Sequence, residues 1–114
     1  MNARSPYLMP AEWAPQERIW MAFPCTGYTL GDTEAEQHEA RSTWAAVAHA
    51  VAEFEPVTMV VHPQDRAAAA RYLSEDVEIL EAPLNDAWMR DIGPTFVHAA
   101  DGSVAAVDWV FNGW

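Results

Sequence analysis

One long amphipathic segment dominates the pattern of apolar and polar positions along the chain. Its apolar residues recur at steps of three and four, at Ala40, Trp44, Val47, Ala48, Val51 and Phe54. This period predicts a helix that buries one stripe of side chains. Thr33 and Glu36 have the spacing of a capping box, and Pro56 cannot continue a helix. We therefore expect a helix from about Thr33 to Phe54.

Short apolar runs on both sides of this segment predict strands. Arg18–Phe23 is one such run, and Val57–His62 is continuous and rich in β-branched residues, as in a buried strand. Residues 77–79 alternate between apolar and acidic, which predicts a third strand. Pro63–Leu73 is rich in alanine and has its proline at the first turn, so it predicts a second helix.

Proline and glycine mark the connecting segments. Pro6–Gln16 contains three prolines and should be an extended arm rather than a helix. Thr26–Asp32 and Pro83–Pro94 have the composition of loops.

A hairpin is predicted near the end of the chain. Thr95–His98 and Val104–Trp109 have the composition of strands, and Asp101-Gly102 between them is a hairpin signal. The predicted order is strand, helix, strand, helix, strand, loop, strand, strand. That order indicates an α/β (α+β) chain.

Composition changes this picture mainly through charge. Seventeen residues are Asp or Glu and six are Lys or Arg, all of them arginine, for a formal net charge of -11. Such a chain repels phosphate backbones, which argues against a nucleic-acid partner. It is compatible with a small cationic substrate, although a solvated acidic surface explains most of the charge. The sequence has neither a membrane-length apolar run nor a signal-peptide core, so we expect a cytoplasmic protein without a membrane partner.

The remaining reactive side chains do not form the pattern of a cofactor site. Cys25 is the single cysteine, and a lone cysteine is more often a small packing residue than a nucleophile. The four histidines lack ligand spacing to carboxylates or to Cys25, so we expect neither a metal nor another cofactor. We expect Trp13, Trp20 and Trp109 to belong to the core.

The densest chemistry lies in one predicted loop. It reads Asn85-Asp86-Ala87-Trp88-Met89-Arg90-Asp91-Ile92-Gly93-Pro94. A carboxylate can accept two parallel N–H bonds from a guanidinium, and an indole face attracts a cation, so the loop suits a planar cation. A structural alternative stays open, in which Arg90 pairs with Asp86 or Asp91 and Trp88 belongs to the core.

The same loop resembles the Asn-Asp-x-Trp-x-Arg-Asp-x-Gly-Pro signature of agmatine deiminases and the related bacterial peptidylarginine deiminases. Three further segments resemble the family in the same order: Met9–Trp13 with Pro15-Gln16, Trp20–Pro24, and Asp108–Trp114. The family more usually has a Trp-Pro pair where this chain has Phe23-Pro24. The resemblance covers essentially the whole chain.

Family membership would imply the pentein fold, a propeller of αβ modules around a central active site. Residues 1–114 would then be the N-terminal part of a single domain that is truncated after Trp114. The resemblance implies that Asp91 grips the substrate guanidinium and that Trp88 lines the same pocket, with Asn85 and Asp86 in support. The family's cysteine nucleophile and its histidine partner lie beyond residue 114, so no catalytic residue is identified in this chain.

The implied reaction is the hydrolysis of agmatine to N-carbamoylputrescine and ammonia, a step of putrescine biosynthesis. A thiolate attacks the guanidinium carbon, ammonia leaves, and water activated by the histidine releases the ureido product. Peptidyl-arginine or free arginine is the alternative substrate. A noncatalytic αβ fragment is the alternative to an enzyme segment, and assembly into a homo-oligomer is compatible with either.

Overall fold

The chain folds as two compact units, which are described one after the other. The computed structural model describes residues 5–27 and 30–111. One unit is formed by residues 16–89, and the other by residues 1–15 together with residues 90–114. Residues 28–29 of the loop predicted at Thr26–Asp32, and residues 112–114 at the end of the last family-like segment, lie outside the described part.

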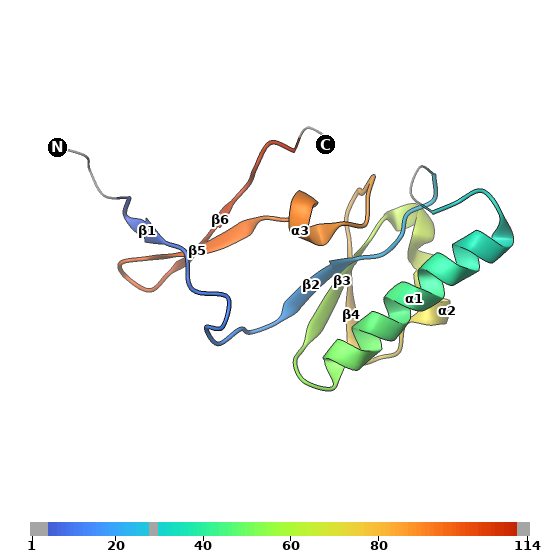
Figure 1. Cartoon of the computed structure of the whole chain (residues 1–114), viewed down its shortest axis with the longest axis horizontal. Coiled ribbons are helices and arrows are strands. Elements are labelled where there is room, and N and C mark those ends of the chain that lie inside the picture. Colours follow the sequence, from blue (N-terminus) through green and yellow to red (C-terminus); the bar gives the residue numbers. More distant parts are fainter. Residues whose placement is uncertain (1–4, 28–29, 112–114) are drawn as a thin grey trace. The chain divides into compact units, whose positions relative to one another are not determined.

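The unit of residues 16–89 is built on a parallel sheet (Figure 1). Its strands are β2 (Ile19–Ala22), β3 (Val57–Val61) and β4 (Val77–Glu81), in the order β2-β3-β4. All five residues of the central strand β3 are buried, which explains its continuous apolar sequence. The three predicted strands are confirmed.

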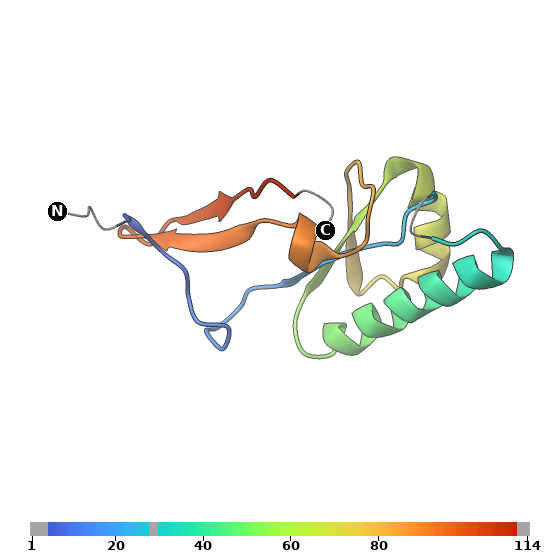
Figure 2. The same cartoon turned by 45° about the horizontal axis from the view of Figure 1, so that its top comes forward.

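Two helical connections join these strands. The long helix α1 (Glu34–Ala52) connects β2 to β3. A 3-10 turn, η1 (Pro63–Asp65), leads directly into α2 (Arg66–Tyr72), which connects β3 to β4. Figure 2 shows both α-helices against the sheet. The α/β class predicted from the sequence is therefore confirmed, with the second helix starting as a 3-10 turn.

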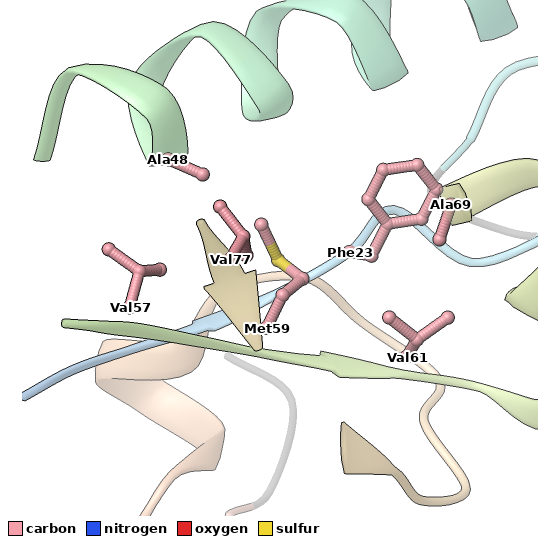
Figure 3. Close-up of a cluster of buried hydrophobic side chains, with 7 residues drawn as sticks. All are labelled: Phe23, Ala48, Val57, Met59, Val61, Ala69 and Val77. Carbon is pink, nitrogen blue, oxygen red and sulfur yellow. The ribbon is translucent and has the colours of Figure 1, made fainter. Parts of the chain in front are cut away.

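The core of this unit lies between the sheet and the two helices. Alternate residues of β3 point toward the helices, where they meet side chains from α1 and α2 (Figure 3). The buried cluster consists of Phe23, Ala48, Val57, Met59, Val61, Ala69 and Val77. Because Ala48 comes from α1 and Ala69 from α2, both helices cover the same face of the sheet. On the other face, Thr58 is buried and accepts a hydrogen bond from the Arg18 guanidinium at 2.6 Å.

The stripe predicted for α1 is only partly correct. Ala48 is buried, and Trp44 and Val51 are half-buried, with Val51 packed against the core. Val47 and Phe54 were expected to be buried, but they are 49% and 87% exposed. Val47 lies about 100° around the helix from Ala48, on the flank of the buried face. Phe54 lies two residues beyond the end of the helix at Ala52, where the helical period no longer applies.

The beginning of α1 is held by the predicted capping box. The Thr33 hydroxyl accepts a hydrogen bond from the Glu36 N–H at 3.2 Å. The Glu36 carboxylate accepts bonds from the backbone N–H groups of Thr33 at 3.0 Å and Asp32 at 2.9 Å. These bonds favour the ionised carboxylate, so they hold the pKa of Glu36 below its usual value. The cap therefore depends on pH.

We expect Thr33→Ala to lower the free energy of unfolding by about 1 kcal/mol, and Glu36→Gln to reduce the loss of stability in acid. The folded-state pKa of Glu36 is depressed, so its contribution is present above the unfolded pKa of about 4.3 and is lost as the pH falls through the folded value. Urea midpoints on both sides of that window measure this. Glu39→Gln, on the same helix but outside the cap, is the control. Equal acid sensitivity in Glu36→Gln and wild type would contradict the expectation.

The other unit is a small antiparallel sheet. Its strands are β1 (Tyr7–Leu8), β5 (Thr95–Ala99) and β6 (Val104–Val107), in the order β1-β5-β6. The arm at Pro6–Gln16 is free of helix as predicted, but it is not extended throughout, because the Ala14 N–H donates to the Ala11 carbonyl at 3.0 Å in a turn. In addition, β1 within the arm pairs with β5, which the prolines did not indicate.

The predicted hairpin between β5 and β6 is confirmed. Gly102 adopts a φ of 84°, a conformation that glycine adopts without steric cost. The Ser103 hydroxyl donates a bond to the Asp101 carboxylate at 2.6 Å and the Ser103 N–H donates another at 2.9 Å. Both lower the pKa of Asp101. The last strand ends two residues earlier than predicted, so Trp109 follows β6.

Two of the three tryptophans expected in the core are exposed. Trp13 is 90% exposed and Trp109 is 62% exposed, whereas Trp20 is half-buried on β2. Both exposed residues lie on irregular segments beside the small sheet rather than on its strands, and Trp109 donates a hydrogen bond to the Thr95 hydroxyl at 2.8 Å. Their assignment to the core was therefore wrong.

Candidate functional site

The family-like loop begins at the carboxyl end of β4. The Ala82 N–H donates to the Val61 carbonyl at 3.0 Å, which continues the ladder for one residue beyond the strand. The chain then leaves the sheet into the motif that starts at Asn85. In open α/β sheets, ligands bind outside the carboxyl ends of the strands. The motif therefore starts at the edge of the sheet where binding sites are usually found.

The first half of the motif belongs to the unit of residues 16–89. Ala87 is 8% exposed and anchors the loop. The Asp86 carboxylate accepts a bond from the Ala87 N–H at 2.7 Å, and the Met89 N–H donates to the Ala87 carbonyl at 3.1 Å. Asn85 is exposed and Asp86 is half-buried. The local bond of Asp86 agrees with a role in shaping the loop, and the binding roles of both residues stay predictions.

Trp88 projects from this anchored loop. It is 51% exposed, which contradicts the alternative that it belongs to the core. Its ring meets the ring of Trp44 from α1, with centroids 5.6 Å apart and planes inclined by 62°. Trp44 was counted with the core stripe because its spacing along the helix cannot distinguish a core contact from a contact with a loop. No signal in the sequence pointed to this pair.

The second half of the motif is helical rather than a loop. Residues Met89–Ile92 form the four-residue helix α3, which corrects the prediction of a continuous loop over Pro83–Pro94. Gly93-Pro94 explains its short length, because the residue before a proline disfavours the helical conformation. Arg90 and Asp91, on this turn, belong to the unit of residues 1–15 and 90–114.

Arg90 makes its ion pair with the opening motif. Its guanidinium lies 3.4 Å from a carboxylate oxygen of Glu12, and both side chains are more than four-fifths exposed, at 87% and 85%. In the described part of the chain, Arg90 is thus paired with Glu12 rather than with Asp86 or Asp91. An exposed pair of this kind stabilises a fold by about 0–1 kcal/mol. The pair brings together two segments that separately resemble the family.

Asp91 is half-buried on α3. Within residues 5–27 and 30–111, its carboxylate has neither a hydrogen bond nor an ion pair from another side chain. A partly buried carboxylate costs free energy unless it is paired, so this group is available to a cation. Its role in substrate binding stays a prediction.

A second polar cluster, which sequence reasoning missed, lies beneath the loop that follows β2. Asp65 is 2% exposed and accepts bonds from the hydroxyl and, at 2.9 Å, the N–H of Thr26. The Arg41 guanidinium from α1 lies 3.6 Å away. Cys25, which precedes Thr26 in the chain, is 3% exposed, as expected for a packing residue. Since Asp65 lies in an alanine-rich segment, nothing local indicated that it would join distant elements.

Within residues 5–27 and 30–111, no three His, Cys, Asp or Glu side chains lie close enough together to hold a metal ion. Helices of those ranges are too short or too polar to cross a membrane.

Known proteins match almost the entire chain. Residues 8–114 match the family model of Porphyromonas-type peptidyl-arginine deiminases. A Streptomyces coelicolor protein, provisionally named an agmatine deiminase, is 57% identical over 108 residues, which are 95% of this chain and 32% of that protein. The agmatine deiminase of Stutzerimonas stutzeri is 42% identical over 109 residues, 95% of this chain and 29% of that protein.

Solved structures agree with these matches. The agmatine deiminase of Enterococcus faecalis superposes with a TM-score of 0.84 at 34% identity, over 96% of this chain and 29% of that chain. The chain therefore spans less than a third of the length of these relatives.

Proposed function

Because the chain belongs to the family of Porphyromonas-type peptidyl-arginine deiminases, we propose that a full-length protein carrying it hydrolyses agmatine to N-carbamoylputrescine and ammonia. Residues 1–114 are the N-terminal part of a single pentein-like domain in this proposal. They supply part of the clamp that holds the substrate guanidinium. The reaction would serve putrescine biosynthesis in the cytoplasm.

The proposal rests mainly on the environment of the Asp91 carboxylate. Its half-buried carboxylate lacks a side-chain partner within the described residues, and it occupies the motif position that the resemblance assigns to the guanidinium. A guanidinium offers two parallel N–H groups to one carboxylate, which compensates for the partial loss of water. A cation of this shape therefore suits Asp91 better than a neutral ligand does.

The exposed indole of Trp88 supports the same class of ligand. About half of the side chain is open, with an exposure of 51%. An indole face attracts a planar cation by roughly 0.5–1 kcal/mol at an exposed site and more when water is excluded. The role of Trp88 in this proposal is to line the pocket in which the guanidinium lies.

Arginine and peptidyl-arginine are the second candidates, because the matching family model carries the peptidyl-arginine name. Free arginine differs from agmatine by an α-carboxylate. The Streptomyces coelicolor and Stutzerimonas stutzeri relatives carry the agmatine deiminase name, and the formal net charge of -11 is compatible with the dication agmatine. We therefore place agmatine first.

The test is product analysis with a full-length protein carrying this chain. It would be incubated separately with agmatine, free arginine and a peptide that contains arginine, and both ammonia and the ureido product would be measured. We expect product mainly from agmatine. Product from an arginine substrate alone would replace the substrate assignment, and the absence of a ureido product from all three would contradict the proposal of a deiminase.

The isolated chain of residues 1–114 is expected to release no detectable ammonia from agmatine. Deimination needs a thiolate and a base, and the lone thiol of the chain, Cys25, is buried in the core with 3% exposure. Ammonia release would be followed with agmatine in excess, and Cys25→Ser is the matched variant. Release by the wild-type chain that disappears in Cys25→Ser would instead identify Cys25 as a nucleophile.

A further inference from the structure

The contact between Trp44 and Trp88 joins the motif to the rigid part of its unit. Trp44 lies in the middle of α1, a helix of 19 residues that is capped at Thr33 and packed on the sheet through Ala48. Trp88 lies on the irregular segment after β4. Their ring centroids are 5.6 Å apart with planes at 62°, which is an edge-to-face arrangement.

Trp88 meets Trp44 from a loop whose backbone is held by other contacts. The loop backbone is anchored by the buried Ala87 and by local bonds of Asp86 and Met89, but these contacts do not determine the direction of the indole. About half of Trp88, 51%, is exposed to solvent. The ring of Trp44 is the aromatic partner that the structure gives it. An edge-to-face contact restricts the tilt of an aromatic ring.

We propose that Trp44 is a positioning residue, which holds the indole of Trp88 so that one face of it is presented to the guanidinium of the substrate. This inference rests on the proposed function and names a determinant of affinity in the same site. A ligand that stacks on a ring binds most tightly when the ring is already oriented in the free protein. Binding then does not include the free-energy cost of ordering the ring.

Substitution of either tryptophan should therefore change the kinetics in a different way from substitution of a reacting group. Trp44 acts through Trp88 and not on the atoms that react, so its loss weakens binding in the ground state and the transition state alike. Such a change raises KM and leaves kcat nearly unchanged. The rival interpretation is ordinary packing between helix and loop, in which loss of Trp44 lowers the melting temperature and leaves KM unchanged.

The experiment uses a full-length protein carrying this chain, with agmatine as the substrate. We expect Trp44→Ala to raise KM roughly two- to twelvefold, which corresponds to about 0.5–1.5 kcal/mol for an aromatic pair, with kcat changed by less than about twofold. Trp44→Phe keeps a ring at this position and should restore most of the affinity. Val47→Ala, on the exposed flank of the same helix, is the matched control and should leave KM unchanged.

A double variant separates positioning from independent contributions. If Trp44 acts only through Trp88, then Trp44→Ala should have no further effect on KM once Trp88→Ala is present. The circular-dichroism signal from coupling between the two indoles should be lost equally in either single variant. That spectrum reports the contact itself, without any substrate.

The outcomes distinguish this inference from the function on which it rests. An unchanged KM in Trp44→Ala, alongside a raised KM in Trp88→Ala, overturns the positioning role and leaves the deiminase intact. Additive effects in the double variant, or the same spectrum in Trp44→Ala as in wild type, overturn it as well. A wild-type protein without turnover of any guanidine substrate overturns the proposed function, and the positioning role with it.

Discussion

Asp91→Asn in a full-length protein carrying this chain is expected to lower kcat/KM for agmatine by at least about a hundredfold. The carboxylate of Asp91 would accept two N–H bonds from the guanidinium and hold it in line with the attacking sulfur. Truncating one partner of a buried charge pair costs roughly 2–5 kcal/mol, and each 1.36 kcal/mol is tenfold in rate. Loss of alignment lowers the rate further.

Asp86→Asn is the matched control for this prediction. The Asp86 carboxylate already accepts a bond from the Ala87 N–H, so its main expected role is local and its loss should cost less. Melting temperatures of both variants would be measured on the preparations used for kinetics. If folded Asp91→Asn protein hydrolyses agmatine at the wild-type rate, Asp91 has no part in the clamp. A lowered melting temperature with normal kcat/KM would assign it a structural role.

Asp65→Ala should be the most destabilising of the single polar substitutions considered, at about 3 kcal/mol. Asp65 is 2% exposed, and its loss would leave the hydroxyl and the N–H of Thr26 without their acceptor and the Arg41 guanidinium without its ion-pair partner. Removing one partner of a buried ion pair costs roughly 3–5 kcal/mol. The Arg41 side chain is still 13% exposed, and its guanidinium lies 3.6 Å from the Asp65 carboxylate. We therefore expect a loss of stability at the lower end of that range.

Urea unfolding measures this effect, with two comparison variants. Asp65→Asn keeps an oxygen that can accept from Thr26 and loses the charge, so it should be less destabilising than Asp65→Ala. Asp76→Ala removes an exposed carboxylate from the turn before β4 and should change stability by less than about 0.5 kcal/mol. Equal midpoints for Asp65→Ala and Asp76→Ala would show that the cluster does not stabilise the fold.

Local sequence patterns predicted the elements of this chain well for a physical reason. The Thr33–Glu36 cap and the buried strand Val57–Val61 are each determined by residues a few positions apart. The pairing of β1 with β5 and the contacts of Asp65 with Thr26 join residues far apart in the sequence. Period and propensity do not contain that information, so these contacts required the three-dimensional structure.

The candidate site also combines residues that the sequence predicted with a contact that it did not predict. Residue types in the motif were sufficient to nominate Trp88 and Asp91, because a planar cation needs a ring and a carboxylate. The contact of Trp44 with Trp88 was hidden, since an aromatic residue at helical spacing predicts burial without naming its partner. Trp13 was misplaced because its apolar surface suggested burial, whereas it lies on a turn outside the strands and is 90% exposed.

The pairing of β1 with β5 also bears on the order of events when the chain is made. Tyr7 lies opposite Ala99, so β1 needs a partner that is synthesised about 90 residues later. At about 5–20 residues per second, the arm leaves the ribosome roughly 5 to 20 s before β5 exists. The parallel sheet of residues 16–89 can form within that interval from nearer neighbours. The arm must stay unpaired until then, and its prolines help by keeping it from joining another strand early.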